Sequence, residues 1–202
     1  MKNVLALGDS YTIGESVPEH GRWVEQWAGL MRNQGHAIAQ PITLIAKNGW
    51  STDELQQAIV EYGPLGQFDL VTLLIGVNNQ YRGLPFDRYR REFVELLKTA
   101  RDAVGGRAEC VQVLSFPDWG QTPFGRLSGR DLHAVSAETD TYNQYAMSVC
   151  QAQDVAFLDI TELTRRHQND PAMHALDGLH PSAAMYGFWA GALLCTGTFG
   201  RL

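Results

Sequence analysis

Five short apolar runs, separated by longer amphipathic segments, constrain the fold of this 202-residue chain more than any other feature. The runs are almost continuously apolar, which is typical of parallel strands that are covered on both faces. Strands with one face in water would show alternating apolar and polar residues instead. We therefore predict strands over residues 3–7, 42–47, 70–75, 110–116 and 156–160.

The segments between these runs have the periodicity of helices. Within residues 87–98, the apolar side chains fall on one helical face and the charges on the other; the apolar ones are Tyr89, Phe93, Leu96 and Leu97. Ser51, three residues before Glu54, predicts a capping box, and Pro181 predicts the first turn of a last helix. The main helices are predicted over residues 22–33, 53–62, 86–104 and 134–153.

This alternation of strands and helices predicts an α/β protein with a three-layer α/β/α sandwich. Five strands favour a parallel sheet in the order 2-1-3-4-5, formed by one domain over residues 1–202. Residues 117–133 are rich in Gly, Pro and Asp and form one long irregular stretch in this prediction. Loops of that size in compact domains are usually functional or mobile.

The composition excludes several classes of protein. A net charge of −6 disfavours a nucleic-acid partner, and no apolar run is long enough to span a membrane. Lys2 and a four-residue apolar run are too little for a signal peptide, so we expect a cytoplasmic protein. The cysteines lack metal-ligand spacing and are expected to be buried free thiols: Cys110, Cys150 and Cys195.

Ligands of such sheets bind beyond the carboxyl ends of the strands. The first predicted strand ends in Gly8-Asp9-Ser10, where Gly8 is expected to let the chain turn sharply. Gly49 follows the second strand, Asn78 the third and Trp119 the fourth. We expect these segments, which are far apart in sequence, to converge at one edge of the sheet.

The segment Gly8-Asp9-Ser10 matches none of the common glycine motifs. It lacks the later glycines of a dinucleotide fingerprint and the G-K-[ST] of a phosphate loop. Thr12 stands where an α/β-hydrolase elbow needs a glycine. Taken alone, Ser10 is as compatible with a helix cap as with a nucleophile.

A second segment, D-G-L-H-P at residues 177–181, supplies a candidate base for Ser10. The Asp177 carboxylate can accept a hydrogen bond from Nδ1–H of His180 and leave Nε2 free to take a proton. His174 lies equally close to Asp177 in sequence but has no flanking turn motif. The remaining histidines fit ordinary surface positions: His20, His36, His133 and His167.

A serine nucleophile also needs donors for the oxyanion of its tetrahedral intermediate. The candidates are the backbone N–H of Ser10, the backbone N–H of Gly49 and the side-chain amide of Asn78. Gly49 and Asn78 are each also compatible with an ordinary turn. Their joint occurrence at the right strand ends favours the oxyanion hole.

These segments together resemble a known family. G-D-S at residues 8–10, Gly49, G-V-N at residues 76–78 and D-G-L-H at residues 177–180 are similar to the four blocks of the SGNH hydrolases, the GDSL-type lipases and esterases. The resemblance covers residues 5 to about 186. It implies a flavodoxin-like fold and ester or thioester hydrolysis through an acyl-enzyme, with no metal or organic cofactor.

By motif position, the resemblance implies Ser10 as nucleophile, His180 as general base and Asp177 as the residue that orients it. Ser10, Gly49 and Asn78 would form the oxyanion hole. The family usually has an acid after that asparagine, and this chain has Asn79. Asn79 cannot supply the charge of that acid, but its carbonyl can still accept a hydrogen bond.

Aromatic residues near the strand ends are candidates for the substrate pocket: Trp50, Tyr81, Trp119 and Phe124. Trp119 and Phe124 are equally compatible with anchoring their loop onto the core. With no lid or membrane-surface helix in the pattern, we predict small, soluble, short-acyl esters as substrates.

Two other functions fit the same fold. One is a flavin- or nucleotide-binding protein, although the loop over residues 8–14 lacks the expected Ser/Thr-rich phosphate-binding pattern. The other is a non-catalytic interaction module. Neither alternative explains why Ser10, Asp177 and His180 occur together.

Overall fold

The computed structural model describes residues 1–196, which fold around one parallel sheet of five strands. The strand order is β2-β1-β3-β4-β5, so the predicted 2-1-3-4-5 order is confirmed. Each observed strand overlaps its predicted run. The strands are β1 (Val4–Gly8), β2 (Thr43–Ala46), β3 (Leu70–Leu74), β4 (Val111–Leu114) and β5 (Ala156–Leu158).

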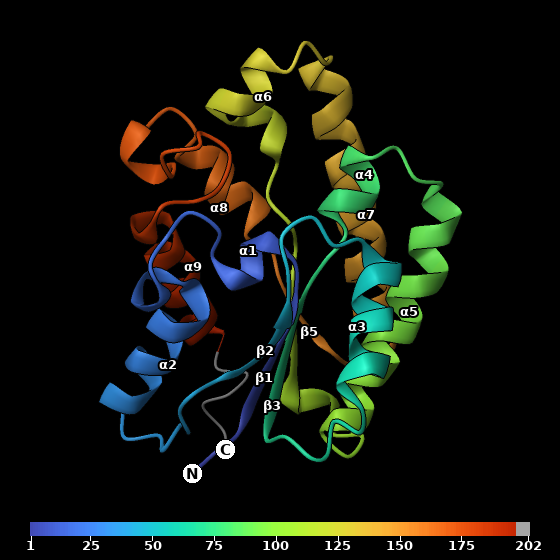
Figure 1. Ribbon diagram of the computed structural model, residues 1–202, viewed down its shortest axis with the longest axis vertical. Helices are drawn as coiled ribbons and strands as arrows, with labels where there is room; N and C mark the ends of the chain where they lie inside the picture. The colour runs from blue at the N-terminus through green and yellow to red at the C-terminus, as the bar shows by residue number, and fades with distance from the viewer. Residues whose placement is uncertain (197–202) are drawn as a thin grey trace.

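Helices cover both faces of the sheet, which gives the predicted three layers. α2 and α9 lie on one face, and α3, α5 and α7 lie on the other (Figure 1). The helices are α1 (Ser10–Ile13), α2 (Trp23–Asn33), α3 (Thr52–Tyr62), α4 (Val77–Tyr81), α5 (Phe86–Ala103), α6 (Pro123–Leu127), α7 (Leu132–Ala152), α8 (Thr161–Arg166) and α9 (Ala183–Cys195).

The apolar runs form strands because the interior of the sheet has no contact with water. Every residue of β1, β3 and β4 is buried, and Leu7 of β1 is in register with Leu73 of β3. β2 and β5 are only partly buried because each has a neighbouring strand on one side alone. The two-sided burial predicted for all five runs therefore holds for the three central strands.

The helices bury apolar faces against this sheet or against each other. All four residues of the predicted α5 stripe are buried: Tyr89, Phe93, Leu96 and Leu97. α2 packs against α9, and large aromatic side chains of both helices are fully buried there, including Trp27 and Trp189. Burying a side chain of that size contributes on the order of 2–3 kcal/mol.

The helix ends show where local sequence signals succeed and fail. The predicted capping box of Ser51 and Glu54 is present at the start of α3. The prediction that Pro181 opens the last helix is wrong: α9 begins at Ala183, and the Ser182 hydroxyl caps it through the Met185 N–H. Pro181 lies instead in a short antiparallel bridge with His174.

Two further expectations need correction. Residues 117–133 are not irregular, because they contain a 3-10 helix (Trp119–Gln121), α6 and the first residues of α7. Cys195 is exposed, since it ends α9, whereas Cys110 and Cys150 are buried as expected.

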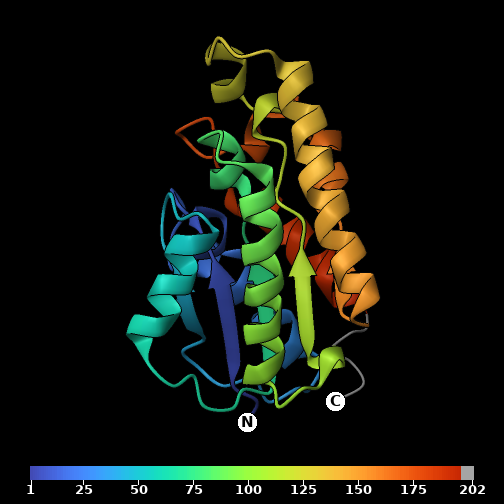
Figure 2. The same ribbon diagram turned by 90° about the vertical axis from the view of Figure 1, so that its right-hand side faces the viewer.

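The strands point toward the end of the molecule that carries α1, α4 and α6, and the N-terminus lies at the opposite end (Figures 1 and 2). The loops that follow the strands therefore gather at one edge of the sheet. Across residues 1–196, no helix is long and apolar enough to span a membrane.

Candidate active site

A pocket of about 310 Å³ opens at the carboxyl edge of the sheet. Its lining includes Ser10 from the start of α1, Gly49 from the β2–α3 loop, Asn78 from α4, and His180 from the segment before α9. The structure thus brings together residues that span 170 positions of sequence.

Ser10 is the first residue of α1 and only 4% exposed. The Asp9 carboxylate caps this helix by accepting a hydrogen bond from the Tyr11 N–H at 3.0 Å. Gly8 has a role that differs from the predicted turn: it is the last residue of β1, and its φ is not positive. A Cβ at Gly8 would lie 2.1 Å from Thr12 Oγ1, so close packing under α1 requires the glycine.

Asp177 and His180 form a direct pair, with 2.7 Å between Oδ2 and Nδ1. The other carboxylate oxygen accepts the backbone N–H groups of Leu179 and His180 at 2.8 and 2.9 Å. Partial burial alone would raise the pKa of Asp177, but these hydrogen bonds, together with one from the Ser16 hydroxyl, hold it well below its ordinary value. Asp177 is therefore an anion, and its Oδ2 is placed to accept a hydrogen bond from Nδ1 of His180.

Ser16 is a contributor that the sequence did not indicate. Its hydroxyl donates to Asp177 Oδ2 at 2.6 Å, and its φ of 66° lies in the left-handed region. That backbone conformation is uncommon for a residue with a side chain. No local motif marks the position, because the contact links residues 161 apart in sequence.

Within the described residues, no hydrogen bond joins the Ser10 hydroxyl to His180, although both line the pocket. His180 is only 6% exposed, and its ring lies 5.5 Å from that of Tyr11. In proteins without bound substrate, such contacts are often long and shorten when substrate binds. His174 does not compete for Asp177, because its ring contacts the Gln168 carbonyl instead.

Of two further predicted oxyanion donors, Gly49 lies in the β2–α3 loop, and Asn78 lies in α4 and braces that loop. Gly49 has a φ of +84°, a conformation that side-chain-bearing residues rarely adopt. The Asn78 side chain donates one N–H to the Trp50 carbonyl at 2.9 Å. An amide has two N–H donors, so Asn78 keeps a second one for a ligand.

Asn79, which stands where the family usually has an acid, is fully buried and supports the same loop. Its oxygen accepts the Thr52 N–H at 3.0 Å, and its amide donates to Thr52 Oγ1 at 2.6 Å. The Thr52 hydroxyl in turn donates to Glu92 at 2.5 Å. The carboxylate in this chain of hydrogen bonds is therefore that of Glu92, which contacts Thr52, and not a side chain at position 79. The neutral side-chain amide of Asn79 both donates a hydrogen bond to Thr52 and accepts one from it.

Of the predicted pocket aromatics, Tyr81 and Trp119 line the pocket, and Trp50 and Phe124 do not. Phe124 lies behind them, with ring centroids 6.5 Å from Tyr81 and 6.3 Å from Trp119. Five lining residues are not among the predicted site residues: Tyr11, Asn48, Val77, Arg82 and Leu179. Val77 and Leu179 lie inside the G-V-N and D-G-L-H segments, and the other three lie in adjoining turns and short helices without a motif of their own.

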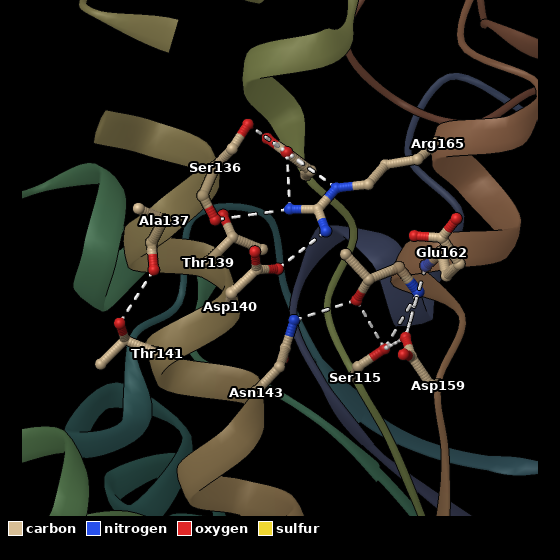
Figure 3. A network of polar contacts seen from close by, with 12 residues as sticks. Ser115, Ser136, Ala137, Thr139, Asp140, Thr141, Asn143, Asp159, Glu162 and Arg165 are labelled. Atoms are coloured by element: carbon tan, nitrogen blue, oxygen red, sulfur yellow. Dashed lines mark hydrogen bonds and ion pairs between the residues drawn. The ribbon is translucent and has the colours of Figure 1, made fainter. Parts of the chain in front are cut away.

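Trp119 is both pocket wall and anchor, because it lines the pocket and is only 1% exposed. Its indole N–H donates to Gln80 Oε1 at 3.1 Å. The preceding residue, Asp118, is buried and accepts from Arg165 at 2.9 Å and from the Ser136 hydroxyl at 2.6 Å. Figure 3 shows the Arg165 guanidinium extending between Ser136 and Asp140, so α7 and α8 both support this wall.

Asp9 is the second unusual carboxyl of the site. Burial raises its pKa from 3.8 to about 7, against the lowering effect of hydrogen bonds from the backbone N–H groups of Tyr11 and Asp9. Its second oxygen, Oδ2, has no hydrogen-bond partner within residues 1–196. A neutral carboxylic acid is therefore a substantial part of the Asp9 population at neutral pH.

The part of the chain that the structure describes contains no group of three His, Cys, Asp or Glu side chains that could hold a metal ion. The arrangement at the pocket instead comprises a hydroxyl, an imidazole–carboxylate pair and amide donors. Such groups can perform nucleophilic and acid–base chemistry.

Solved structures with the same fold cover nearly the whole chain. A lipolytic protein of the G-D-S-L family from Veillonella parvula DSM 2008 aligns over 99% of both chains, with 18% identity and a TM-score of 0.78. A structure of TesA aligns over 97% of this chain and 98% of that one, with 15% identity and a TM-score of 0.74. Axe2, an acetylxylan esterase from Geobacillus stearothermophilus, aligns over 96% and 93%, with 19% identity and a TM-score of 0.74.

A search of curated protein sequences finds no match. A family model, in contrast, matches residues 6–188, which include the G-D-S segment, Gly49, Asn78 and the Asp177–His180 pair. This chain belongs to the GDSL-like lipase/acylhydrolase family.

Proposed function

We propose that the protein is a serine ester hydrolase that acts through a Ser10–His180–Asp177 triad and an acyl-enzyme. The observation that carries this proposal is the 2.7 Å pair of His180 and Asp177 in the same pocket as Ser10. Family membership favours it over a flavin-binding or non-catalytic role.

In the proposed first half-reaction, Ser10 Oγ attacks the ester carbonyl carbon while Nε2 of His180 takes the hydroxyl proton. The carbon–oxygen bond to the alcohol then breaks, and His180 returns that proton to the leaving alkoxide. In the second half-reaction, a water molecule attacks the acyl-enzyme with the same base, which releases the acid and restores Ser10.

The negative charge of each tetrahedral intermediate would be held by three donors. The Ser10 N–H is free of intrahelical bonding because it belongs to the first turn of α1. The Gly49 N–H and the second amide N–H of Asn78 come from the neighbouring loop and helix, and both residues line the pocket. Donors that are fixed before reaction stabilise the developing charge without reorganisation.

The pocket supports small, short-acyl esters as substrates. Its volume of about 310 Å³ lies at the lower end for small-molecule sites, and Tyr81 and Trp119 bound it. Trp119 is held in place by Gln80, so widening the pocket for a long acyl chain would require a braced wall to move.

A series of p-nitrophenyl esters from acetyl to palmitoyl, together with acetylated sugars, tests the function. We expect the fastest turnover with the shortest acyl groups and near-complete loss of turnover in Ser10→Ala. Ser148→Ala, which removes an exposed serine hydroxyl of α7, is the matched control and should equal the wild type. Equal hydrolysis by wild type and Ser10→Ala would refute the mechanism.

A further inference from the structure

α4 and the residue that follows it hold the β2–α3 loop and the first residue of α3. Asn78 donates to the Trp50 carbonyl at 2.9 Å, and Arg82, which follows the last residue of α4, donates to the Gly49 carbonyl at 2.5 Å. Asn79 contacts both the backbone and the side chain of Thr52. The loop that carries the proposed Gly49 donor is thus positioned from one short helix.

Arg82 is the part of this arrangement that directly holds Gly49. A Cβ added at Gly49 would have one non-neighbouring heavy atom within 4 Å among the described residues, a terminal nitrogen of Arg82 at 3.6 Å. Gly49 has no side chain of its own to pack. Its backbone is the most permissive in the loop. The turn hydrogen bond from the Trp50 N–H to the Lys47 carbonyl at 3.3 Å restrains it on one side, and the guanidinium is the side chain that holds its carbonyl.

Glu54 fixes the other side of the guanidinium. Arg82 Nη1 lies 2.9 Å from Glu54 Oε2, and the same oxygen accepts the Ser51 N–H at 2.9 Å. Burial alone would raise the pKa of Glu54, but hydrogen bonds from Ser51 and the charge of Arg82 hold it below its ordinary value. Glu54 is therefore an anion at neutral pH, and it links Arg82 to the capping box that starts α3.

We propose that Arg82 is a positioning residue of the oxyanion hole and is itself oriented by Glu54. By holding the Gly49 carbonyl it fixes the Gly49–Trp50 peptide plane, which limits rotation about the Gly49 Cα and so restrains the Gly49 N–H in the preceding peptide plane. This inference rests on the proposed function. Arg82 lines the pocket, so the competing role is direct binding of substrate. The two roles differ in kinetics, because a misaligned oxyanion donor lowers kcat, whereas a lost substrate contact raises KM.

The test compares Arg82→Ala, Arg82→Lys and Glu54→Gln by kcat, KM and melting temperature with p-nitrophenyl acetate. Displacing a catalytic group by about 1 Å can cost about 100-fold, so we expect kcat of Arg82→Ala to fall about 10- to 100-fold with little change in KM. Lysine can hold the Gly49 carbonyl with one donor, so Arg82→Lys should recover part of the loss. Glu54→Gln should show a smaller fall, because the contact to Gly49 remains.

Arg90→Ala is the matched control, since it removes a similar exposed ion pair, to Asp87 on α5, far from the oxyanion donors. It should leave kcat unchanged. Hydrogen exchange of the peptide covering residues 47–51 gives a readout that needs no substrate, and it should speed up in Arg82→Ala and not in Arg90→Ala. If Arg82→Ala does not fold, Arg82→Lys and Glu54→Gln carry the same comparison.

A folded Arg82→Ala with wild-type kcat, or with a raised KM alone, would overturn the inference, as would unchanged exchange of residues 47–51. Failure of the proposed function has a different signature. In that case the wild type would hydrolyse no ester, or Ser10→Ala would match it, whatever the Arg82 variants do.

Discussion

The substitution Asp177→Asn tests the proposed pair of Asp177 and His180 most stringently, because it keeps the size of the side chain. The carboxylate has only donors around it. Oδ2 accepts from Ser16 and from Nδ1 of His180, and Oδ1 accepts the backbone N–H groups of Leu179 and His180. An asparagine amide has one oxygen and one NH₂ group, so it can satisfy only one of these two sides.

The backbone N–H groups of Leu179 and His180 determine the orientation of the new side-chain amide in Asp177→Asn. If the NH₂ group faced Leu179 and His180, two backbone donors would lose their acceptor, at about 1–3 kcal/mol each. With the oxygen on the backbone side, the NH₂ group faces Nδ1 of His180, which must then accept and move its proton to Nε2. The base-competent form is thus disfavoured by about 2–6 kcal/mol, which corresponds to about 30-fold to about 3 × 10⁴-fold in rate.

Steady-state hydrolysis of p-nitrophenyl acetate measures this loss directly. We expect kcat of Asp177→Asn to fall within that range, with the larger losses resembling the ~10⁴-fold effect of the same change in serine protease triads. Asp177→Ala imposes no tautomer on His180, so it should lose no more than Asp177→Asn. A folded Asp177→Asn within fivefold of the wild type, or an alanine variant far worse than the asparagine variant, would refute the reasoning.

Three further predictions concern the surrounding residues. Asn78→Ala should lower kcat about 10²- to 10³-fold while keeping the fold, and near-wild-type turnover would remove Asn78 from the site. Trp119→Ala should shift the acyl preference toward longer chains and lower the melting temperature, whereas a loss of stability alone would make Trp119 an anchor only. Because the folded-state pKa of Asp9, about 7, lies above its ordinary value of 3.8, ionisation of Asp9 should cost stability as pH rises through that interval, by up to about 4 kcal/mol. Asp9→Asn keeps an oxygen for the Tyr11 N–H without that ionisation. The melting temperature of Asp9→Asn minus that of the wild type should therefore increase from pH 4.5 to pH 8. A difference that does not change with pH would contradict this.

The fold was largely predictable because its main signals are local or periodic. Continuous apolar runs identify buried strands, and the capping box at Ser51 identifies the start of α3. The start of α9 was mispredicted because Pro181 suits a first helical turn equally well in isolation. Its bridge to His174 depends on the path of the preceding loop, which no short window of sequence contains.

The candidate site shows the same division. Asp177 and His180 are three residues apart, so their pairing follows from local geometry. Ser16 and Arg82 carry no motif, because each acts through a contact between distant segments, to Asp177 and to Gly49. The pocket wall could be predicted only in part. Trp50, Trp119 and Phe124 are all aromatic residues that follow strand ends in the sequence, and only their packing in the folded chain determines that Trp119 lines the pocket and the other two do not.

Covalent labelling of Ser10 is the measurement that tests the central claim most directly. The protein is treated with a fluorophosphonate probe, and peptide mass spectrometry then locates the adduct in the wild type, in Ser10→Ala and in the Ser148→Ala control. We predict one adduct, on Ser10, in the wild type and the control, and none in Ser10→Ala. An unlabelled wild type, or an adduct that persists elsewhere together with ester hydrolysis in Ser10→Ala, would contradict the account.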